Sequence, residues 1–317
     1  MNDKHNGLVT VLGGGGFIGR YVCETLLKAG TRLRVAERHP RRAFFLQPLA
    51  AVGQLDLMKA DVTNRDSVAA AVAGASAVIN LVGVLKGDFE ALQADGAAIV
   101  AEESASAGAA ALVHVSAIGA DPDSPSRYGA SKGEGEARVR AAFPKATIIR
   151  PSLVFGPEDQ LTNRFAGLMS LLPAYPVIAP RTRFQPVFVR DLARAIAVAA
   201  LDPKAHAGKT YEIAGPEVMT MRQLSERIAA MSGQSPTLID LPDFAAEALS
   251  YLGFLPGAPL TRDQWLMLKR DNVAAAKSKG LEAFGITPTP MAAVAPAWLE
   301  RFREGGRFAA RREASAG

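Results

Sequence analysis

A run of four glycines near the start of the chain constrains the fold more than any other feature. Residues 8–12 (LVTVL) can fill a buried strand, residues 13–19 (GGGGFIG) follow at once, and a helical pattern covers 17–29. Between a strand and a helix, glycines allow a tight turn, a close approach of the backbone to a pyrophosphate and close packing of the helix on the strand. A flexible turn would explain the glycines alone, but the flanking elements favour a dinucleotide-binding loop.

The amino-acid composition is typical of a globular protein and argues against a membrane-spanning or disulfide-linked one. The chain has 317 residues, of which 49% are hydrophobic and 21% charged, as in ordinary globular proteins. No apolar run is long enough to span a bilayer, and residues 1–7 show no targeting pattern. The single cysteine, Cys23, excludes an internal disulfide. We therefore expect a cytoplasmic protein, at most peripheral on the inner face of an energy-transducing membrane.

Strand-like and helical patterns alternate through the first half of the chain, which predicts a parallel sheet covered on both faces. The expected strands are 8–12, 33–36, 54–60, 77–82, 111–115 and 146–149, and the expected helices are 17–29, 41–51, 64–72, 89–107 and 127–142. The predicted fold class is α/β, a doubly wound parallel sheet of the Rossmann type with a smaller C-terminal α/β lobe.

The second half contains fewer regular patterns. We expect residues 1–155 and 187–214 to form the nucleotide-binding domain, and 209–213 to add a strand to its sheet. Residues 156–186 and 215–303 would form the smaller lobe, and 304–317 a flexible tail. An apolar helix is expected over 244–255. Burial of its large side chains in that lobe is favoured over a surface for a partner subunit or a membrane.

The ends of the predicted strands carry polar residues at the edge where parallel sheets bind ligands. Glu37 follows the second strand and would accept the ribose hydroxyls of NAD. Arg38, with Arg41 and Arg42 close behind it, would bind the 2′-phosphate of NADP. The arginines favour NADP(H), although a solvated charge run is the alternative. Asp61 and Val62 are expected to flank the adenine, and residues 81–83 to pass close to the cofactor.

Tyr128 and Lys132 lie four residues apart and share one face of the helix 127–142. A lysine ammonium beside a phenol lowers the pKa of the phenol, which then serves as a general acid or base. Such a pair also occurs on ordinary surface helices. Its position before the sixth strand of a dinucleotide fold favours the functional interpretation.

Four motifs together resemble the extended or atypical short-chain dehydrogenases/reductases. They are GxxGFIG at 13–19, YxxxK at 128–132, RPSxVFG at 150–156 and VxVxDL at 187–192. The resemblance implies that Pro151–Val154 line the nicotinamide side and that Ser116 belongs to the catalytic region. Active members place a serine or threonine beside the substrate carbonyl, and Ile118 stands at that position here, with Ser116 and Ser131 as alternative donors. Loss of one such donor lowers rates by about two powers of ten.

Further segments resemble the family of NADPH-binding accessory subunits of respiratory complex I. They are 53–55 (GQL), 78–83 (VINLVG), 114–116 (HVS), 126–128 (SRY), 142–144 (AFP), 155–159 (FGxED), 185–187 (QPV) and 261–263 (TRD). This resemblance implies a protein that binds its nucleotide without turnover and contacts complex I subunits. An active NADP-dependent reductase, epimerase or dehydratase acting on a quinone precursor or nucleotide sugar, and an NADPH-level redox sensor, remain open alternatives.

The expected site residues divide into two groups and include no metal ligands, because the four histidines are scattered. The expected catalytic residues are Ser116, Tyr128 and Lys132. The expected NADP(H)-binding residues, with NAD(H) as a weaker possibility, are Gly13, Gly15, Gly16, Phe17, Ile18, Gly19, Arg38, Arg42, Asp61, Val62, Leu81, Val82, Gly83, Ser116, Tyr128, Lys132, Pro151, Ser152, Leu153 and Val154.

Overall fold

The computed structural model describes residues 7–255 and 260–303 and divides them into two compact units. The first unit contains the described residues up to 151, together with 189–213 and 274–287. The second contains 152–188 and the described parts of 214–273 and 288–317. Residues 274–287 thus belong to the first unit, although the sequence pattern had assigned them to the smaller lobe. The expected tail at 304–317 lies outside the described residues.

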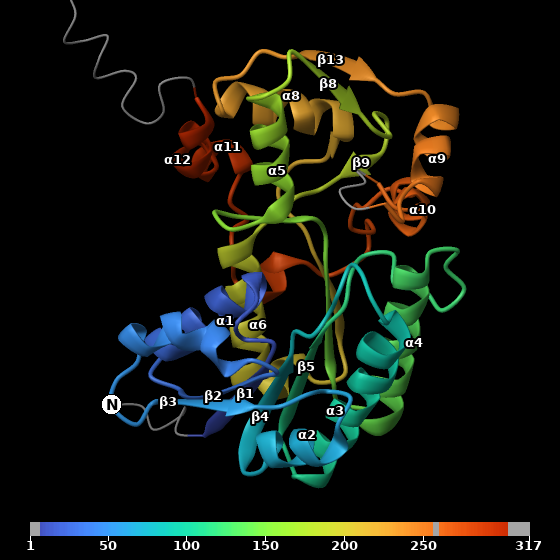
Figure 1. Ribbon diagram of the computed structural model, residues 1–317. Coiled ribbons are helices and arrows are strands. Elements are labelled where there is room, and N and C mark those ends of the chain that lie inside the picture. Colours follow the sequence, from blue (N-terminus) through green and yellow to red (C-terminus); the bar gives the residue numbers. More distant parts are fainter. Residues whose placement is uncertain (1–6, 256–259, 304–317) are drawn as a thin grey trace, which may run out of the picture. The chain divides into compact units, whose positions relative to one another are not determined.

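A seven-stranded parallel sheet forms the centre of the first unit, in the order β11-β6-β5-β4-β1-β2-β3 (Figure 1). The first strand in the sequence, β1, lies inside the sheet, where it pairs with β2 on one side and β4 on the other. The predicted doubly wound sheet is therefore confirmed. The strands are β1 (Leu8–Leu12), β2 (Arg32–Glu37), β3 (Leu55–Lys59), β4 (Ala75–Asn80), β5 (Ala111–Val115), β6 (Thr147–Pro151) and β11 (Thr210–Ile213).

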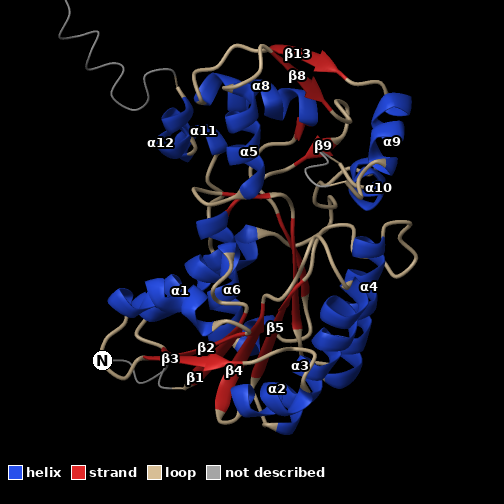
Figure 2. Ribbon diagram, in the orientation of Figure 1, coloured by secondary structure: helices blue, strands red, loops and turns tan. Residues whose placement is uncertain are grey.

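Helices cover both faces of this sheet (Figure 2). One face carries α1 (Phe17–Lys28) and α6 (Val189–Leu201), and the other carries α2 (Arg65–Val72), α3 (Gly96–Ser106) and α4 (Arg127–Ala142). The short helix α7 (Pro203–His206) precedes β11. Beneath α2, α3 and α4, a core of aliphatic side chains includes Val68, Val78, Val100, Leu112 and Ile148. Burial of these groups from water supplies the main driving force for the fold.

Two predicted helices have a different form in the structure. The expected helix 41–51 is a 3-10 helix, η2 (Pro40–Leu49), which contains Pro48 and buries only Ala43 and Leu46. The expected helix 89–107 begins as a π-helical segment, η3 (Glu90–Asp95), before it continues as α3. A side chain at Gly135 of α4 would lie 2.1 Å from the Gln93 carbonyl oxygen, so η3 and α4 approach closely here. Single π-helical turns of this kind are typical of functional sites.

The predicted strand 209–213 is confirmed as β11, which pairs in parallel with β6 at one edge of the sheet. Residues 274–287 pack beside it. The Glu212 carboxylate accepts a hydrogen bond of 2.7 Å from the amide of Ala275, and the Glu212 amide donates one of 3.0 Å to Lys279 O. The 3-10 helix η4 (Leu281–Phe284) then stacks Phe284 on His206.

The second unit contains three small sheets and several helices. Its paired strands are β7 (Val154–Phe155) with β10 (Val187–Phe188), β9 (Arg183–Phe184) with β12 (Met219–Thr220), and β8 (Ala174–Val177) with β13 (Thr237–Asp240). Its helices are α5 (Gln160–Met169), α8 (Met221–Met231), α9 (Asp243–Tyr251), α10 (Arg262–Leu268), α11 (Met291–Val294), α12 (Pro296–Leu299) and η5 (Glu300–Phe302). The predicted capping box at the start of α8 is present, with Thr220 and Gln223 bonding reciprocally.

The expected burial of the apolar residues around α9 is wrong. This helix buries only the small side chains of Ala246 and Ser250. Five large apolar side chains are exposed instead, and we call them the α9 patch: Phe244, Tyr251, Leu252, Phe254 and Leu255. Helical periodicity predicts that apolar groups share a face, but it does not determine whether that face is covered.

Candidate nucleotide-binding site

The glycine loop turns the chain from β1 into α1. Gly13 adopts φ +84°, which favours glycine, and its amide donates to Ala36 O at 3.1 Å. Gly16 is the first residue before α1, and no side chain caps this helix. The first amides of α1 are thus available at a helix N-terminus, where the backbone dipoles favour an anion such as a pyrophosphate.

The loop glycines have different steric roles. A β-carbon at Gly19 would lie 2.3 Å from Gly13 O, and one at Gly14 would lie 2.7 Å from Val35 Cγ1. These two glycines allow helix, loop and strand to pack together. Gly16 is exposed, and a β-carbon there would meet only Gly13 O, at 3.3 Å. Gly16 is therefore free of core packing and faces the space where a ligand would lie.

A pocket of about 210 Å³ lies at the carboxyl ends of β1, β2, β3 and β4. It brings together many of the predicted cofactor residues from separate segments. Those among its lining are Gly13, Gly15, Gly16, Arg38, Arg42, Val62, Leu81, Val82 and Gly83. The parallel sheet produces this convergence, because the loops that follow neighbouring strands meet at one edge.

The carboxylate of Glu37, a residue of the pocket lining, accepts a hydrogen bond from the glycine loop. Its Oε1 accepts a hydrogen bond of 2.6 Å from the amide of Gly15. A β-carbon at Gly15 would lie 2.9 Å from that oxygen and 3.2 Å from Arg42 Cβ, so a larger residue would crowd both side chains. One oxygen of the acidic group expected to accept ribose hydroxyls thus fixes the glycine loop.

Arg38 and Arg42, which line the pocket together with Glu37, are exposed. Among the described residues, neither Arg38 nor Arg42 has an ion-pair partner. Arg38 contributes to a lowered pKa of Asp61, although hydrogen bonds from Thr63 are the larger favourable cause. The Thr63 amide and hydroxyl both donate to Asp61 Oδ1, at 3.0 and 2.8 Å, and Asp61 does not line the pocket. Two guanidinium groups beside the pocket are suited to a phosphate.

Tyr128 and Lys132 lie on the first two turns of α4, which Ser126 caps by accepting a hydrogen bond from the Gly129 amide at 3.2 Å. Lys132 is 3% exposed, and its Nζ donates to Val115 O at 3.1 Å. Burial lowers the pKa of Lys132 to about 8 and raises the pKa of Tyr128 to about 12. The predicted lowering of the Tyr128 pKa is therefore wrong, because burial raises this pKa.

Ser116 and Ile118 follow β5. The Ser116 hydroxyl is buried and has no hydrogen-bond partner among the described residues. Ile118 lies two residues further along, and its amide donates to Pro151 O at 3.0 Å. The aliphatic side chain of Ile118 provides no hydrogen-bond donor. Ser116 is thus the only hydroxyl of this short segment, residues 116–120, that a ligand could engage.

Sequence reasoning missed a polar group beside Lys132. Gln93 of η3 is 1% exposed, and its Nε2 donates to Ser131 Oγ at 3.2 Å, while its Oε1 has no partner among the described residues. A β-carbon at Gly83 would lie 3.1 Å from Lys132 Nζ and 3.5 Å from Gln93 Oε1. Both side chains therefore border the loop after β4. A glutamine within a helical pattern carries no signal that would distinguish it.

A buried pair on neighbouring strands was also missed. Asn80 and His114 face each other on β4 and β5, with Nδ2 and Nδ1 3.3 Å apart. The Asn80 Oδ1 accepts a hydrogen bond from the Val82 amide and thereby fixes the loop that lines the pocket. Burial, with a smaller contribution from Lys132, lowers the pKa of His114 to about 3, so this histidine is neutral at physiological pH.

The remaining predicted residues are distributed as follows. Pro151 ends β6 in the first unit, whereas Ser152, Leu153 and Val154 belong to the second unit. Phe17 and Ile18 begin α1. Among the described residues, no group of three or more His, Cys, Asp or Glu could hold a metal ion. No helix in that part of the chain is long and apolar enough to cross a membrane.

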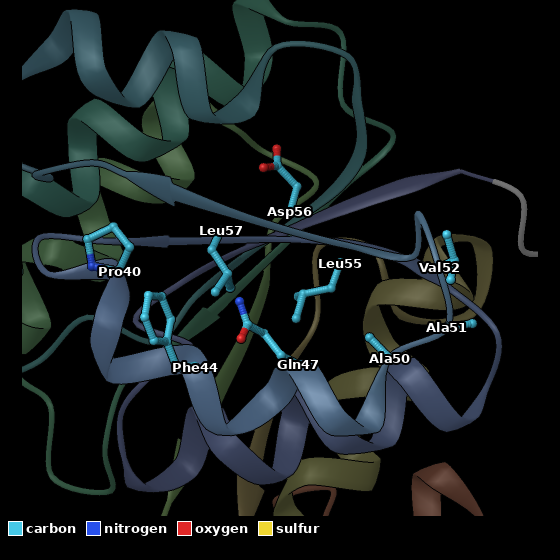
Figure 3. A pocket seen from close by; sticks show the side chains of 9 residues that line it. All are labelled: Pro40, Phe44, Gln47, Ala50, Ala51, Val52, Leu55, Asp56 and Leu57. Carbon is cyan, nitrogen blue, oxygen red and sulfur yellow. The ribbon is translucent and has the colours of Figure 1, made fainter.

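A second depression, of about 520 Å³, lies between η2 and β3 and does not overlap the nucleotide pocket (Figure 3). Phe44 and Gln47 project from η2 toward Leu55 and Leu57 of β3. The lining is mostly aliphatic, and Asp56 is its only charged residue. The Asp56 carboxylate accepts a hydrogen bond from Arg34 at 3.0 Å.

The glycine loop, the parallel sheet and the pocket at its carboxyl edge define a nucleotide-binding protein with a Rossmann-like fold. Residues 9–214 match the NAD dependent epimerase/dehydratase family, and the chain belongs to that family.

The similarity to individual relatives extends over both units. The mouse protein NADH dehydrogenase [ubiquinone] 1 alpha subcomplex subunit 9, mitochondrial, is 34% identical over 293 residues, which cover 90% of this chain and 77% of the mouse protein. The Neurospora crassa NADH-ubiquinone oxidoreductase 40 kDa subunit is 26% identical, over 94% of this chain and 80% of its own length. A ceramide reductase of Caulobacter vibrioides is 30% identical, over 77% and 76% of the two chains.

Solved structures share the fold at lower identity. The NADPH-dependent quinone oxidoreductase of Escherichia coli, complexed with NADPH, has a TM-score of 0.73 at 22% identity and covers 92% of this chain and 99% of its own. The Citrobacter triphenylmethane reductase complexed with NADP(H) has a TM-score of 0.72 at 19% identity, over 89% and 97%.

Proposed function

We propose that this protein is a non-catalytic accessory or assembly subunit associated with respiratory complex I, and that it holds NADP(H) in the pocket at the carboxyl ends of β1 to β4. The observation that carries the proposal is similarity to complex I subunits over 90% of the chain, including the second unit. The family match, in contrast, ends at residue 214. Similarity beyond the nucleotide-binding segment indicates a shared use of the second unit.

The catalytic region supports a holding role. Ile118 stands where active relatives are expected to carry a hydroxyl donor. Ser116, Tyr128 and Lys132 would then bind the nicotinamide ribose rather than drive a reaction, with Pro151, Ser152, Leu153 and Val154 beside the nicotinamide.

The arginines support a preference for NADP(H) over NAD(H). Glu37 uses one carboxylate oxygen to fix the loop through Gly15, and Arg38 and Arg42 are exposed beside it. A 2′-phosphate would give these guanidinium groups a doubly charged partner, which the ribose hydroxyl of NAD does not. The bound nucleotide would also stabilise the fold through mass action.

The α9 patch supports contact with a partner subunit. It combines two phenylalanines, a tyrosine and two leucines on and just after one helix, all exposed. Clusters of large apolar side chains on a surface mark interaction sites. In this proposal the protein is cytoplasmic and peripheral, and it reaches the membrane through the complex.

A specific observation also favours a second candidate, an active NADP-dependent reductase. The Caulobacter vibrioides relative is named as a ceramide reductase. Lys132 lies one turn after Tyr128 on α4, and a lowered lysine pKa of about 8 suits proton transfer near neutral pH. Bound NADPH would supply the hydride, and Tyr128 the proton.

One experiment separates the two candidates. The protein is purified with its co-purifying nucleotide, the nucleotide is identified, and its redox state is followed by absorbance with quinones, ketones and ceramides. In parallel, tagged protein is used to recover partners from detergent-solubilised membranes of the source organism. Recovery of complex I subunits with no oxidation of NADPH supports the accessory subunit. Steady NADPH oxidation that depends on Tyr128, without such partners, supports the reductase.

A further inference from the structure

One arginine of α4 binds both ends of η3. The Arg138 guanidinium forms ion pairs with Glu90 and Asp95, the first and last residues of η3, and its contact with Glu90 measures 3.1 Å. Its Nε donates a hydrogen bond of 2.8 Å to Glu134, one turn earlier on α4. Without this shared cation the three carboxylates would repel one another, so its loss should matter more than the loss of an isolated surface ion pair.

Two further contacts join η3 to α4. The Gln93 side chain donates to Ser131 Oγ at 3.2 Å, and a β-carbon at Gly135 would lie 2.1 Å from the Gln93 carbonyl oxygen. These contacts are buried, whereas the carboxylates that bind Arg138 are exposed. The segment η3 is thus held on α4 by close packing in the interior and by one guanidinium at the surface.

η3 and the residues that flank it border the candidate site at three points. Leu92 of η3 lines the nucleotide pocket. Phe89, directly before η3, packs edge-on against the ring of Tyr128, with the two centroids 6.2 Å apart. A β-carbon at Gly96, directly after η3, would lie 2.9 Å from Cγ2 of Val62, another residue of the pocket lining. A displacement of η3 on α4 would therefore reshape the wall of the pocket.

We propose that Arg138 is a positioning residue of the nucleotide site, because it holds η3 against α4. This inference rests on the proposed function, which places NADP(H) in the pocket of the first unit. Arg138 does not line the pocket and acts through Leu92 and Gly96, whose positions depend on η3. All these residues belong to the first unit. A wall that is already in place does not have to be ordered when the nucleotide binds, and this raises affinity.

The test compares two arginines that each bind several carboxylates at the surface. Arg138→Met removes the cation that binds η3. Arg65→Met is the matched control, because Arg65 of α2 binds Glu102 and Glu103 of α3, which lie outside η3 and outside the pocket lining. NADPH is titrated calorimetrically into each variant and into wild type. The melting temperature and the hydrogen exchange of the η3 amides are measured on the same samples.

The expected result is selective. Arg138→Met should weaken NADPH binding by about fivefold and speed exchange of the η3 amides, because the unpaired carboxylates repel one another. Arg65→Met should lower the melting temperature by a comparable amount and keep the NADPH affinity within about twofold of wild type. A triple variant that adds Glu90→Gln and Asp95→Asn to Arg138→Met should recover most of the affinity, because it removes the repulsion.

The contrary outcomes are distinct. Wild-type affinity in folded Arg138→Met, equal losses in Arg138→Met and Arg65→Met, or no recovery in the triple variant would each overturn the positioning role and leave the proposed cofactor standing. Wild-type protein that does not bind NADPH would overturn the proposed function and this inference with it. If Arg138→Met does not fold, Arg138→Lys takes its place, with an expected loss of about threefold, because an ammonium group cannot bridge three carboxylates as a guanidinium does.

Discussion

Lys132 Nζ donates a hydrogen bond of 3.1 Å to the backbone carbonyl of Val115, the last residue of β5. This bond ties the Lys132 ammonium group to the sheet, one helical turn along α4 from Tyr128. Its pKa of about 8 and the Tyr128 pKa of about 12 both follow from burial. The first prediction therefore concerns the phenol of Tyr128.

Tyr128→Phe tests whether the phenol takes part in a reaction. For an accessory subunit, we expect NADPH affinity to fall by no more than about tenfold and no turnover to lose, because a ribose contact of this kind is a single neutral hydrogen bond. Affinity is measured by calorimetry and turnover by NADPH absorbance. A reductase would instead lose at least about a hundredfold in rate, and that loss would contradict the accessory role.

Lys132→Met tests the burial of a titratable amine. The folded protein releases this proton near pH 8, whereas the unfolded chain keeps it up to about pH 10.5. The unfolded state thus binds more protons between these values, so the free energy of unfolding of the wild type should rise with pH in this window relative to the variant. The rise is up to about 3 kcal/mol and should vanish below pH 8. Urea denaturation at a series of pH values measures it, and a constant difference would contradict the assigned pKa.

Arg38→Ala tests the preference for NADP(H). Loss of a charge-assisted contact to the 2′-phosphate should weaken NADPH by about 1.5–3 kcal/mol and leave NADH nearly unchanged. Arg41→Ala is a matched control, because Arg41 is exposed in the same basic run but does not line the pocket. Calorimetric titration in one buffer compares wild type and both variants with each of the two nucleotides. Equal losses for NADPH and NADH would show that Arg38 does not contact the 2′-phosphate.

Gly16→Val tests whether the glycine loop binds the pyrophosphate of NADPH. A branched side chain would occupy the space of the pyrophosphate but meets little protein, since a β-carbon there contacts only Gly13 O at 3.3 Å. The variant should fold, and its melting temperature should no longer respond to NADPH, whereas wild type gains about 2.7 kcal/mol at a hundred times the dissociation constant. Gly19→Ala is the contrasting variant. It should lower the melting temperature without ligand, because its β-carbon would lie 2.3 Å from Gly13 O.

A Leu252→Asp/Phe254→Asp double variant tests the α9 patch. These side chains are 49% and 79% exposed, so the change should alter the melting temperature and NADPH affinity little. Recovery of complex I subunits from solubilised membranes should fall sharply, because charges in an apolar interface must be desolvated. Val52→Asp, at a fully exposed position of the first unit, is the control. Unchanged recovery in the double variant would exclude the patch as the contact.

Much of the sheet could be predicted from local patterns. The β-branched runs at 8–12 and 111–115 match β1 and β5 residue for residue. The other first-unit strands differ by one or two residues at their ends, where hydrogen bonding rather than composition decides. The 3-10 form of η2 and the π-helical form of η3 could not be predicted, since η3 depends on how closely α4 approaches through Gly135.

The sequence by itself determined the glycine loop, the order of strands and helices and the residues that gather at the carboxyl edge of the sheet. Those features depend on steric and periodic properties of neighbouring residues, and right-handed crossovers then define the topology. Tertiary structure alone decided that Glu37 binds the Gly15 amide, that Arg138 binds both ends of η3 and that the α9 patch is exposed. Such contacts depend on which surfaces of distant segments meet, and burial at those surfaces also sets the pKa values of Tyr128 and Lys132.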